Sequence, residues 1–171
     1  LIKKHELTRP DKENDRTRHI EITNANTGPV FLTFRNDGGF QKHIADIKNQ
    51  ETDITFQADD GTIHSLWKIT SSGTLESLSR YFDSIPALYI ADGHHRAASA
   101  SRVQKIRKDN NPQHRGDESY NYFLSVIFPH DEMQILGYNR LVKDLAGLSE
   151  DQFLELIKTR FMLEQLPNLQ K

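Results

Sequence analysis

The sequence contains no cysteine, and this absence removes several classes of chemistry at once. Disulfide bonds, thiolate metal sites and catalysis by a thiol nucleophile are all excluded. Long apolar runs are missing as well, since none approaches the roughly 18 residues that a membrane-spanning helix requires. The first residues are charged rather than apolar, so no signal peptide is predicted. We therefore expect no membrane partner and, by default, a cytoplasmic location.

An excess of charge of one sign is also missing, because the formal net charge is only -2. Such a balance creates no field that attracts nucleic acid, which argues against a nucleic-acid partner. The 171 residues are enough for one domain with a buried core. Because the chain opens with Leu1 and ends in a polar stretch, we expect a single domain over residues 1–171 that is a fragment of a longer chain. Its core is expected at 3–145 and a helical or strand extension at 146–171, and the oligomeric state is not predicted.

The most informative stretch is residues 87–100, which predicts a strand, a tight turn and a helix. Strand-forming residues fill 87–91, and Asp92 and Gly93 interrupt them. From Arg96 onward, alanines and aliphatic residues recur at helical spacing. A helix start has unpaired N–H groups and a positive dipole end, so it favours an anion. Gly93 permits close backbone approach, and the Arg96 guanidinium matches phosphate oxygens.

A simpler interpretation of the same stretch is a capped helix. In that case Asp92 is the N-cap, Gly93 makes the turn, and His94 and His95 are surface residues. Two histidines and an arginine at a positive helix end repel one another, which makes sense if an anion binds there. Adjacent helical histidines point about 100° apart and rarely share one metal ion, so no metal ligand set is predicted.

The remaining patterns predict an α+β protein with a mixed sheet, hairpins and flanking helices. A helix is expected to start near Thr8 and Pro10, with the charged residues Lys12, Asp15, Arg16 and His19 on one face. This face is either a solvated surface or a charged wall of a ligand pocket. Ser149 and Gln152 predict a capping box. The other expected elements are strands at 1–7, 30–34, 52–57, 62–69, 120–128 and 133–136, helices at 40–49 and 75–82, and a polar loop at 105–118.

Five motifs together resemble the family catalogued as domain of unknown function 1015. They are Lys4-His-Glu-Leu-Thr8, Lys12-Glu-x-Asp-Arg16, the hairpin end Leu66-Trp67, Tyr89-Ile-Ala-Asp-Gly-His-His-Arg96 and Leu136-Gly-Tyr-Asn-Arg-Leu141. The resemblance runs in order from about Lys3 to Leu145. It implies a fold more than a function, because the activity of that family is not established.

A more distant resemblance, carried by Gly93-His-His-Arg96, is to the ParB/sulfiredoxin superfamily. It implies a ParB/sulfiredoxin-like core around a strand–turn–helix phosphate site. The motif Asp-Gly-His-His-Arg is most similar to that of an ADP-dependent free-serine kinase. Sulfiredoxin has a catalytic cysteine where His94 stands, so sulfinic-acid reduction is excluded here. Partitioning proteins of this superfamily need a DNA-binding helix-turn-helix, which the sequence does not show.

The resemblance implies roles for particular residues, with ADP or ATP and magnesium as cofactors. Gly93 to Arg96 would hold a phosphate, and His94 or His95 would donate to the transferring group. Glu6 or Asp92 would act as the base or hold magnesium, although the base is not assigned. Further candidates for phosphate binding are His5, Lys12 and Arg16.

Three functions remain open at this stage. The first is a nucleotide-dependent phosphotransferase that acts on a small hydroxyl metabolite such as a free amino acid. The second is a non-catalytic module that senses a nucleotide or another anion. The third is a ParB-like, DNA-associated protein, which the charge balance disfavours. The first two predict small-molecule partners, a nucleotide and in the first case also a metabolite.

Overall fold

The computed structural model describes residues 1–137 and 140–164. Its backbone divides into two compact units, Leu1–Met133 and Gln134–Lys171, and each is described here by itself. The expectation of a single domain with a core ending at residue 145 stays a prediction. No described helix is long and apolar enough to cross a membrane.

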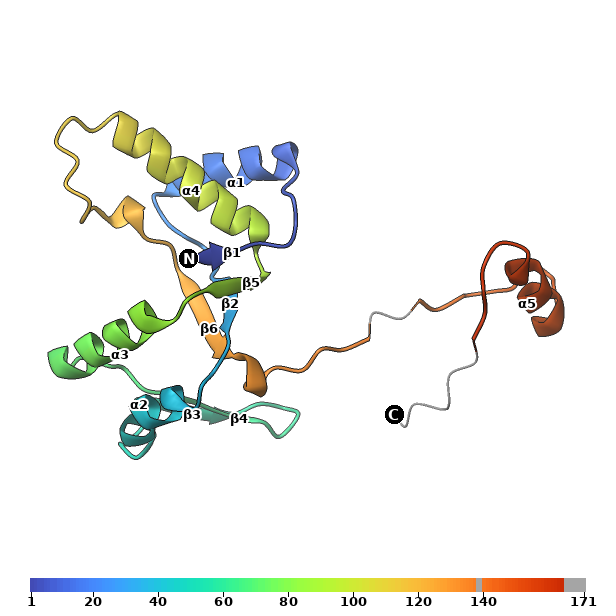
Figure 1. Cartoon of the computed structure of the whole chain (residues 1–171), viewed down its shortest axis with the longest axis horizontal. Coiled ribbons are helices and arrows are strands. Elements are labelled where there is room, and N and C mark those ends of the chain that lie inside the picture. Colours follow the sequence, from blue (N-terminus) through green and yellow to red (C-terminus); the bar gives the residue numbers. More distant parts are fainter. Residues whose placement is uncertain (138–139, 165–171) are drawn as a thin grey trace. The chain divides into compact units, whose positions relative to one another are not determined.

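The first unit contains a four-stranded mixed sheet with the order β1-β5-β2-β6 (Figure 1). Strand β1 (Ile2–Lys3) is parallel to β5 (Leu88–Asp92), and β5 is antiparallel to β2 (Val30–Phe34). Strand β2 is in turn parallel to β6 (Ser125–Pro129). The mixed sheet and the α+β class expected from the sequence are therefore confirmed.

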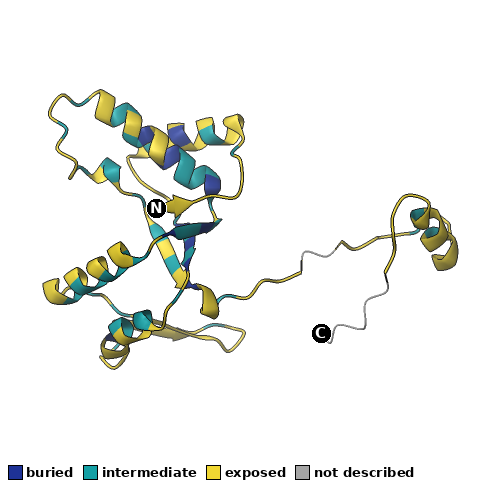
Figure 2. Ribbon diagram, in the orientation of Figure 1, coloured by how far each residue is buried: buried dark blue, intermediate teal, exposed yellow. Residues whose placement is uncertain are grey.

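The core lies along β2, whose alternate side chains Val30, Leu32 and Phe34 are buried (Figure 2). This alternation follows from the period of two that places successive side chains on opposite faces of a strand. Val30 and Leu32 pack with Ile90 of β5, while Phe34 contacts Phe82 and other rings edge to face. The predicted strand at 30–34 is confirmed with its bounds.

Helices α1 (Pro10–Thr23) and α4 (His94–Asp109) lie side by side (Figure 1). They run in the same direction, because both their first and their last turns are in contact. At one end the backbone N–H of Arg9 donates to His95, and at the other the Arg107 guanidinium donates to Asn24. The two helix N-termini therefore lie at the same end of the pair.

The rest of the first unit consists of short elements. Ser71 is the N-cap of α3 (Ser72–Ser84), so this helix begins before the start expected at residue 75. The expected hairpin is present with shorter strands, the helix expected at 40–49 is shifted by one residue, and the helix expected at 75–82 is longer at both ends. These elements are α2 (Gly39–Lys48), β3 (Ile54–Gln57), β4 (Ile63–Leu66), α3 (Ser72–Ser84), and the 3-10 turns η1 (Ser119–Asn121) and η2 (His130–Glu132).

Several predicted bounds were wrong near the site. The strand expected at 1–7 is limited to two residues, whereas α1 begins at Pro10, within the start expected near Thr8 and Pro10, and Arg9 is its N-cap. Gly93 rather than Asp92 is the N-cap of α4, because Asp92 still belongs to β5. Helix α4 also continues to Asp109, through a stretch expected to be loop, since lysine and arginine are good helix formers.

The strand expected at 120–128 is shorter, because residues 119–121 form a 3-10 turn first. The return strand expected at 133–136 is absent from the described residues. Instead η2 follows β6, and its His130 imidazole accepts a hydrogen bond from the backbone N–H of Asn36. This contact ties η2 to the segment that follows β2.

The second unit contains one described helix, α5 (Glu150–Lys158). The predicted capping box is confirmed: the Ser149 hydroxyl accepts from the backbone N–H of Gln152, and the Gln152 side chain accepts from the backbone N–H of Ser149. In the family motif at 136–141, Tyr138 and Asn139 lie outside the described residues. The extension expected at 146–171 likewise lies partly outside them.

Candidate functional site

The turn between β5 and α4 has the geometry of an anion-binding helix start. Gly93 adopts a left-handed conformation with φ 93°, which a glycine accepts without strain. The first intrahelical bond runs from the N–H of Ala97 to the carbonyl of Gly93. Helix geometry leaves the N–H groups of His94, His95 and Arg96 without acceptors inside α4. These donors are therefore free for a ligand.

One face of α1 supplies positive charge beside this turn. Arg9, Lys12, Arg16 and His19 recur at intervals of three and four residues, so they share one face of the helix. All four line a pocket of about 640 Å³ together with the β5–α4 turn. Of the two interpretations of this face, the charged wall of a pocket is the one that the geometry favours. Asp15 is not among the lining residues.

The pocket brings together most of the residues predicted from the sequence. Arg9, Lys12, Arg16 and Arg96 are four cations, whereas Glu6 and Asp92 are the two carboxylates of the lining. The remaining candidate, His5, contacts the ring of His94. The lining residues are Glu6, Arg9, Lys12, Arg16, His19, Ile20, Asn26, Thr27, Gly28, Asp92, Gly93, His94, His95 and Arg96.

Arg96 occupies the space that Gly93 was expected to leave for a ligand. A Cβ on Gly93 would lie 2.8 Å from the Arg96 Nε, and the guanidinium also lies against Gly28. One of its N–H groups donates to the Asp92 carboxylate at 2.5 Å. Glycine at 93 is thus needed for the approach of an arginine side chain. The guanidinium still lines the pocket, with donors beyond the one that Asp92 takes.

Lys12 and Arg16 differ from the other two cations of the pocket. Arg9 pairs with Asp11 at 2.9 Å, and Arg96 pairs with Asp92. Among the described residues, Lys12 and Arg16 have no ion-pair partner. Among the described residues, the positive charges of Lys12 and Arg16 are therefore not balanced by an ion pair.

His94 is a buried residue that contacts Glu6. Its residue exposure is only 5%, and its Nδ1 lies 3.3 Å from the Glu6 carboxylate. Burial lowers the pKa of His94, and His5 lowers it further, while Glu6 and Asp92 oppose these effects. Nδ1 is the ring nitrogen that faces the Glu6 carboxylate. Nε2 is buried without a hydrogen-bond partner, so in this conformation the ring does not reach a ligand directly.

His95 connects the two helix N-termini. Its Nε2 accepts a hydrogen bond of 3.1 Å from the backbone N–H of Arg9, the N-cap of α1. One turn further, the Ser99 hydroxyl donates to the carbonyl of Glu13. These contacts hold α1 against α4, so His95 positions Arg9 at the pocket. The roles predicted for His94 and His95 in phosphate transfer stay predictions.

Sequence reasoning missed several lining residues. Arg9 could have been found, because it lies three residues before Lys12 on the same helical face. The segment 26–28 gave no such signal, since it is irregular and reaches the pocket only because it connects α1 with β2. Among the described residues, no group of three or more potential ligands is arranged for a metal ion.

Comparison with known proteins gave a family and no individual relative. The model of a family described as "Protein of unknown function (DUF1015)" matches residues 1–171. A search of curated proteins and a search of solved structures each found no match. The predicted likeness to the ParB/sulfiredoxin superfamily stays a prediction.

Proposed function

Because the chain belongs to the DUF1015 family, whose description assigns no activity, we propose its function from the pocket: it binds the phosphates of a nucleoside di- or triphosphate. The observation that carries this proposal is the junction of two helix N-termini with four cations around one cavity of about 640 Å³. Both helix ends present positive dipoles, and cavities of this size suit small-molecule ligands.

Electrostatics support an anion rather than a neutral ligand. Lys12 and Arg16 lie one turn apart on α1 without an ion-pair partner among the described residues. Assembling like charges around a cavity destabilises the fold unless a counter-charge binds there. A ligand with two or more phosphates supplies that charge at both the α4 amides and the α1 side chains.

The residues present also fit the magnesium complex of a nucleotide. Magnesium is bound mainly by phosphate oxygens and water, with one or two protein carboxylates. Glu6 and Asp92 both line the pocket and are exposed, so either can supply such a ligand. A dedicated protein cage is not needed for this mode of binding.

We further propose phosphoryl transfer to a small hydroxyl metabolite, such as a free amino acid. Glu6 takes the proton of the hydroxyl, and the hydroxyl oxygen bonds to the terminal phosphorus. The bond from that phosphorus to its bridging oxygen breaks, and the shortened nucleotide leaves. The observation favouring this step is the contact from His94 to Glu6, which orients an exposed carboxylate in a cationic pocket.

Titration calorimetry of the full chain with ADP and ATP, with and without magnesium, tests the binding. We expect Arg16→Ala to weaken binding by about one to two orders of magnitude, because a charge-assisted contact contributes about 1.5–3 kcal/mol and 1.4 kcal/mol is a factor of ten. Arg80→Ala is the matched control, since Arg80 is an exposed arginine of α3 outside the pocket. Absence of nucleotide binding to the wild type would refute the proposal.

A transfer assay separates catalysis from sensing. With ATP or ADP and a set of free hydroxyl amino acids, the wild type is expected to form a phosphorylated product. Glu6→Gln is expected to bind nucleotide but not to transfer phosphate. Nucleotide binding without transfer by the wild type would instead establish the non-catalytic sensor, and salt-dependent binding to duplex DNA would favour the ParB-like alternative.

A further inference from the structure

A second, smaller cavity adjoins the pocket and has a different chemistry. Its volume is about 100 Å³, and it shares Ile20 and Asn26 with the lining of the larger pocket. Instead of a cluster of cations, it combines aliphatic and aromatic side chains with the polar side chains of Asn24, Asn26, Arg107 and Ser119. Its lining residues are Ile20, Asn24, Ala25, Asn26, Ala100, Val103, Arg107, Ser119, Tyr120 and Tyr122.

The two cavities follow the same side of the parallel helix pair. On α4, Arg96 lines the larger pocket, whereas Ala100 and Val103 line the smaller one, and this spacing keeps them in one row. On α1, Arg16 and Ile20 continue the row in the same direction. Seven residues separate Arg96 from Val103, a rise of about 10 Å along the helix. A sugar with its first phosphate can bridge such a separation.

The composition of the small cavity suits a flat ring with a polar edge. Ala100 and Val103 are buried and form an apolar surface. Tyr122 is 65% exposed and, among the described residues, its ring stacks on no other aromatic side chain. The side chains of Asn26 and Ser119 offer donors and acceptors at the rim. Nucleobases bind through this combination of stacking and edge hydrogen bonds.

We propose that this cavity holds the base of a nucleotide whose phosphates lie in the larger pocket. The inference rests on the proposed function, and it adds the selection of a nucleotide over a plain polyphosphate. Tyr122 stacks on the base, and the Asn26 amide, which lines both cavities, bonds to the base or the sugar.

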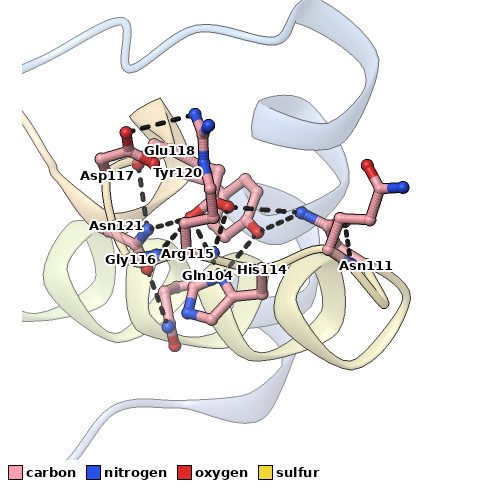
Figure 3. A network of polar contacts seen from close by, with 10 residues as sticks. Gln104, Asn111, His114, Arg115, Gly116, Asp117, Glu118, Tyr120 and Asn121 are labelled. Atoms are coloured by element: carbon pink, nitrogen blue, oxygen red, sulfur yellow. Dashed lines mark hydrogen bonds and ion pairs between the residues drawn. The ribbon is translucent and has the colours of Figure 1, made fainter.

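The wall opposite α4 is held in place before a ligand arrives (Figure 3). The hydroxyl of Tyr120 contacts His114 at 2.9 Å and accepts from Asn111 at 3.0 Å, and its ring stacks on His114. Glu118 accepts from the backbone N–H groups of Arg115 and Gly116. A preorganised wall loses less conformational freedom on binding, which favours affinity.

The test compares ADP with pyrophosphate on the full chain by titration calorimetry. The wild type is expected to bind ADP about 5- to 150-fold more tightly than pyrophosphate, which is the factor that stacking of one base contributes. Tyr122→Ala is expected to weaken ADP binding about tenfold without changing pyrophosphate binding, and Tyr122→Phe to keep most of the ADP affinity. Phe56→Ala is the matched control, since Phe56 is an exposed aromatic of β3 outside both cavities.

The possible outcomes separate this inference from the proposed function. Equal affinity of the wild type for ADP and pyrophosphate overturns the inference and leaves the phosphate site intact. Equal losses for both ligands in Tyr122→Ala, or the same loss in Phe56→Ala, also overturn it. Failure to bind either ligand overturns both proposals. If Tyr122→Ala does not fold, Asn26→Ala replaces it, and unchanged ADP affinity in that variant refutes the inference.

Discussion

Replacing Gly93 by alanine tests the geometry of the site most directly. Gly93 is the N-cap of α4 with φ 93°, in the left-handed region that disfavours residues with a Cβ. An added Cβ would lie 2.8 Å from the Nε and 3.0 Å from an N–H₂ group of Arg96. The arginine must therefore move away from the turn, and its ion pair with Asp92 must change.

The expected loss of stability has two parts. The left-handed backbone costs about 1–2 kcal/mol for a residue other than glycine. The Arg96–Asp92 pair is partly exposed and contributes about 0–1 kcal/mol. Gly93→Ala is thus expected to lower the free energy of unfolding by about 1–3 kcal/mol, measured by urea denaturation. Because Arg96 is displaced from the pocket, ADP affinity is expected to fall about tenfold.

Gly38→Ala is the matched control for this experiment. Gly38 is the N-cap of α2, also left-handed at φ 84°, and a Cβ there would meet nothing within 4 Å. Its substitution should cost a similar backbone energy and leave ADP affinity unchanged. If Gly93→Ala keeps wild-type affinity, or if Gly38→Ala loses as much, the placement of Arg96 over Gly93 does not matter for binding and the reasoning is refuted.

Two further substitutions test the supports of the site. His95→Ala removes the acceptor for the backbone N–H of Arg9, so it is expected to weaken ADP binding several-fold in titration calorimetry. His95→Gln keeps an acceptor and is expected to retain part of the affinity. Equal losses of affinity in the two variants would refute a positioning role for His95. The backbone N–H of Arg115 is the largest cause that lowers the pKa of Glu118 from 4.5 to about 2. The stabilising contribution of the Glu118 carboxylate is present above about pH 4.5 and is lost as the pH falls toward 2. The difference in free energy of unfolding between the wild type and Glu118→Gln, measured in urea, is therefore expected to shrink over that range. A constant difference would contradict this account.

Features that depend on local chemistry were predictable from the sequence. The strand-forming run Val30–Phe34 indicated β2, and the Ser149 and Gln152 pair indicated the start of α5. The capping box is recognisable because its hydrogen bonds join residues three positions apart, and the strand is recognisable because its apolar residues follow one another in the sequence. Gly93 also indicated the turn before α4, although the capped-helix interpretation placed the cap one residue early, at Asp92.

Features that depend on particular side-chain contacts were not predictable, even where the two residues are close in sequence. The polar and aromatic stretch at 119–124 has the composition of a strand, yet Glu118 and Asn121 direct its start into a 3-10 turn. The position of Arg96 was also misjudged, because the space over Gly93 was assumed to be open. In each case a side-chain contact overrode a local preference.

The sequence by itself determined the chemistry that this protein lacks, the class of its fold and the strand–turn–helix that carries Gly93 and Arg96. Only the tertiary structure decided that α1 runs parallel to α4, so that Lys12 and Arg16 face that turn across one pocket. The physical reason is the range of the interactions. Turns, caps and helical faces arise from neighbours in the chain, whereas His95 reaches Arg9 across 86 positions of sequence, a pairing that no local pattern encodes.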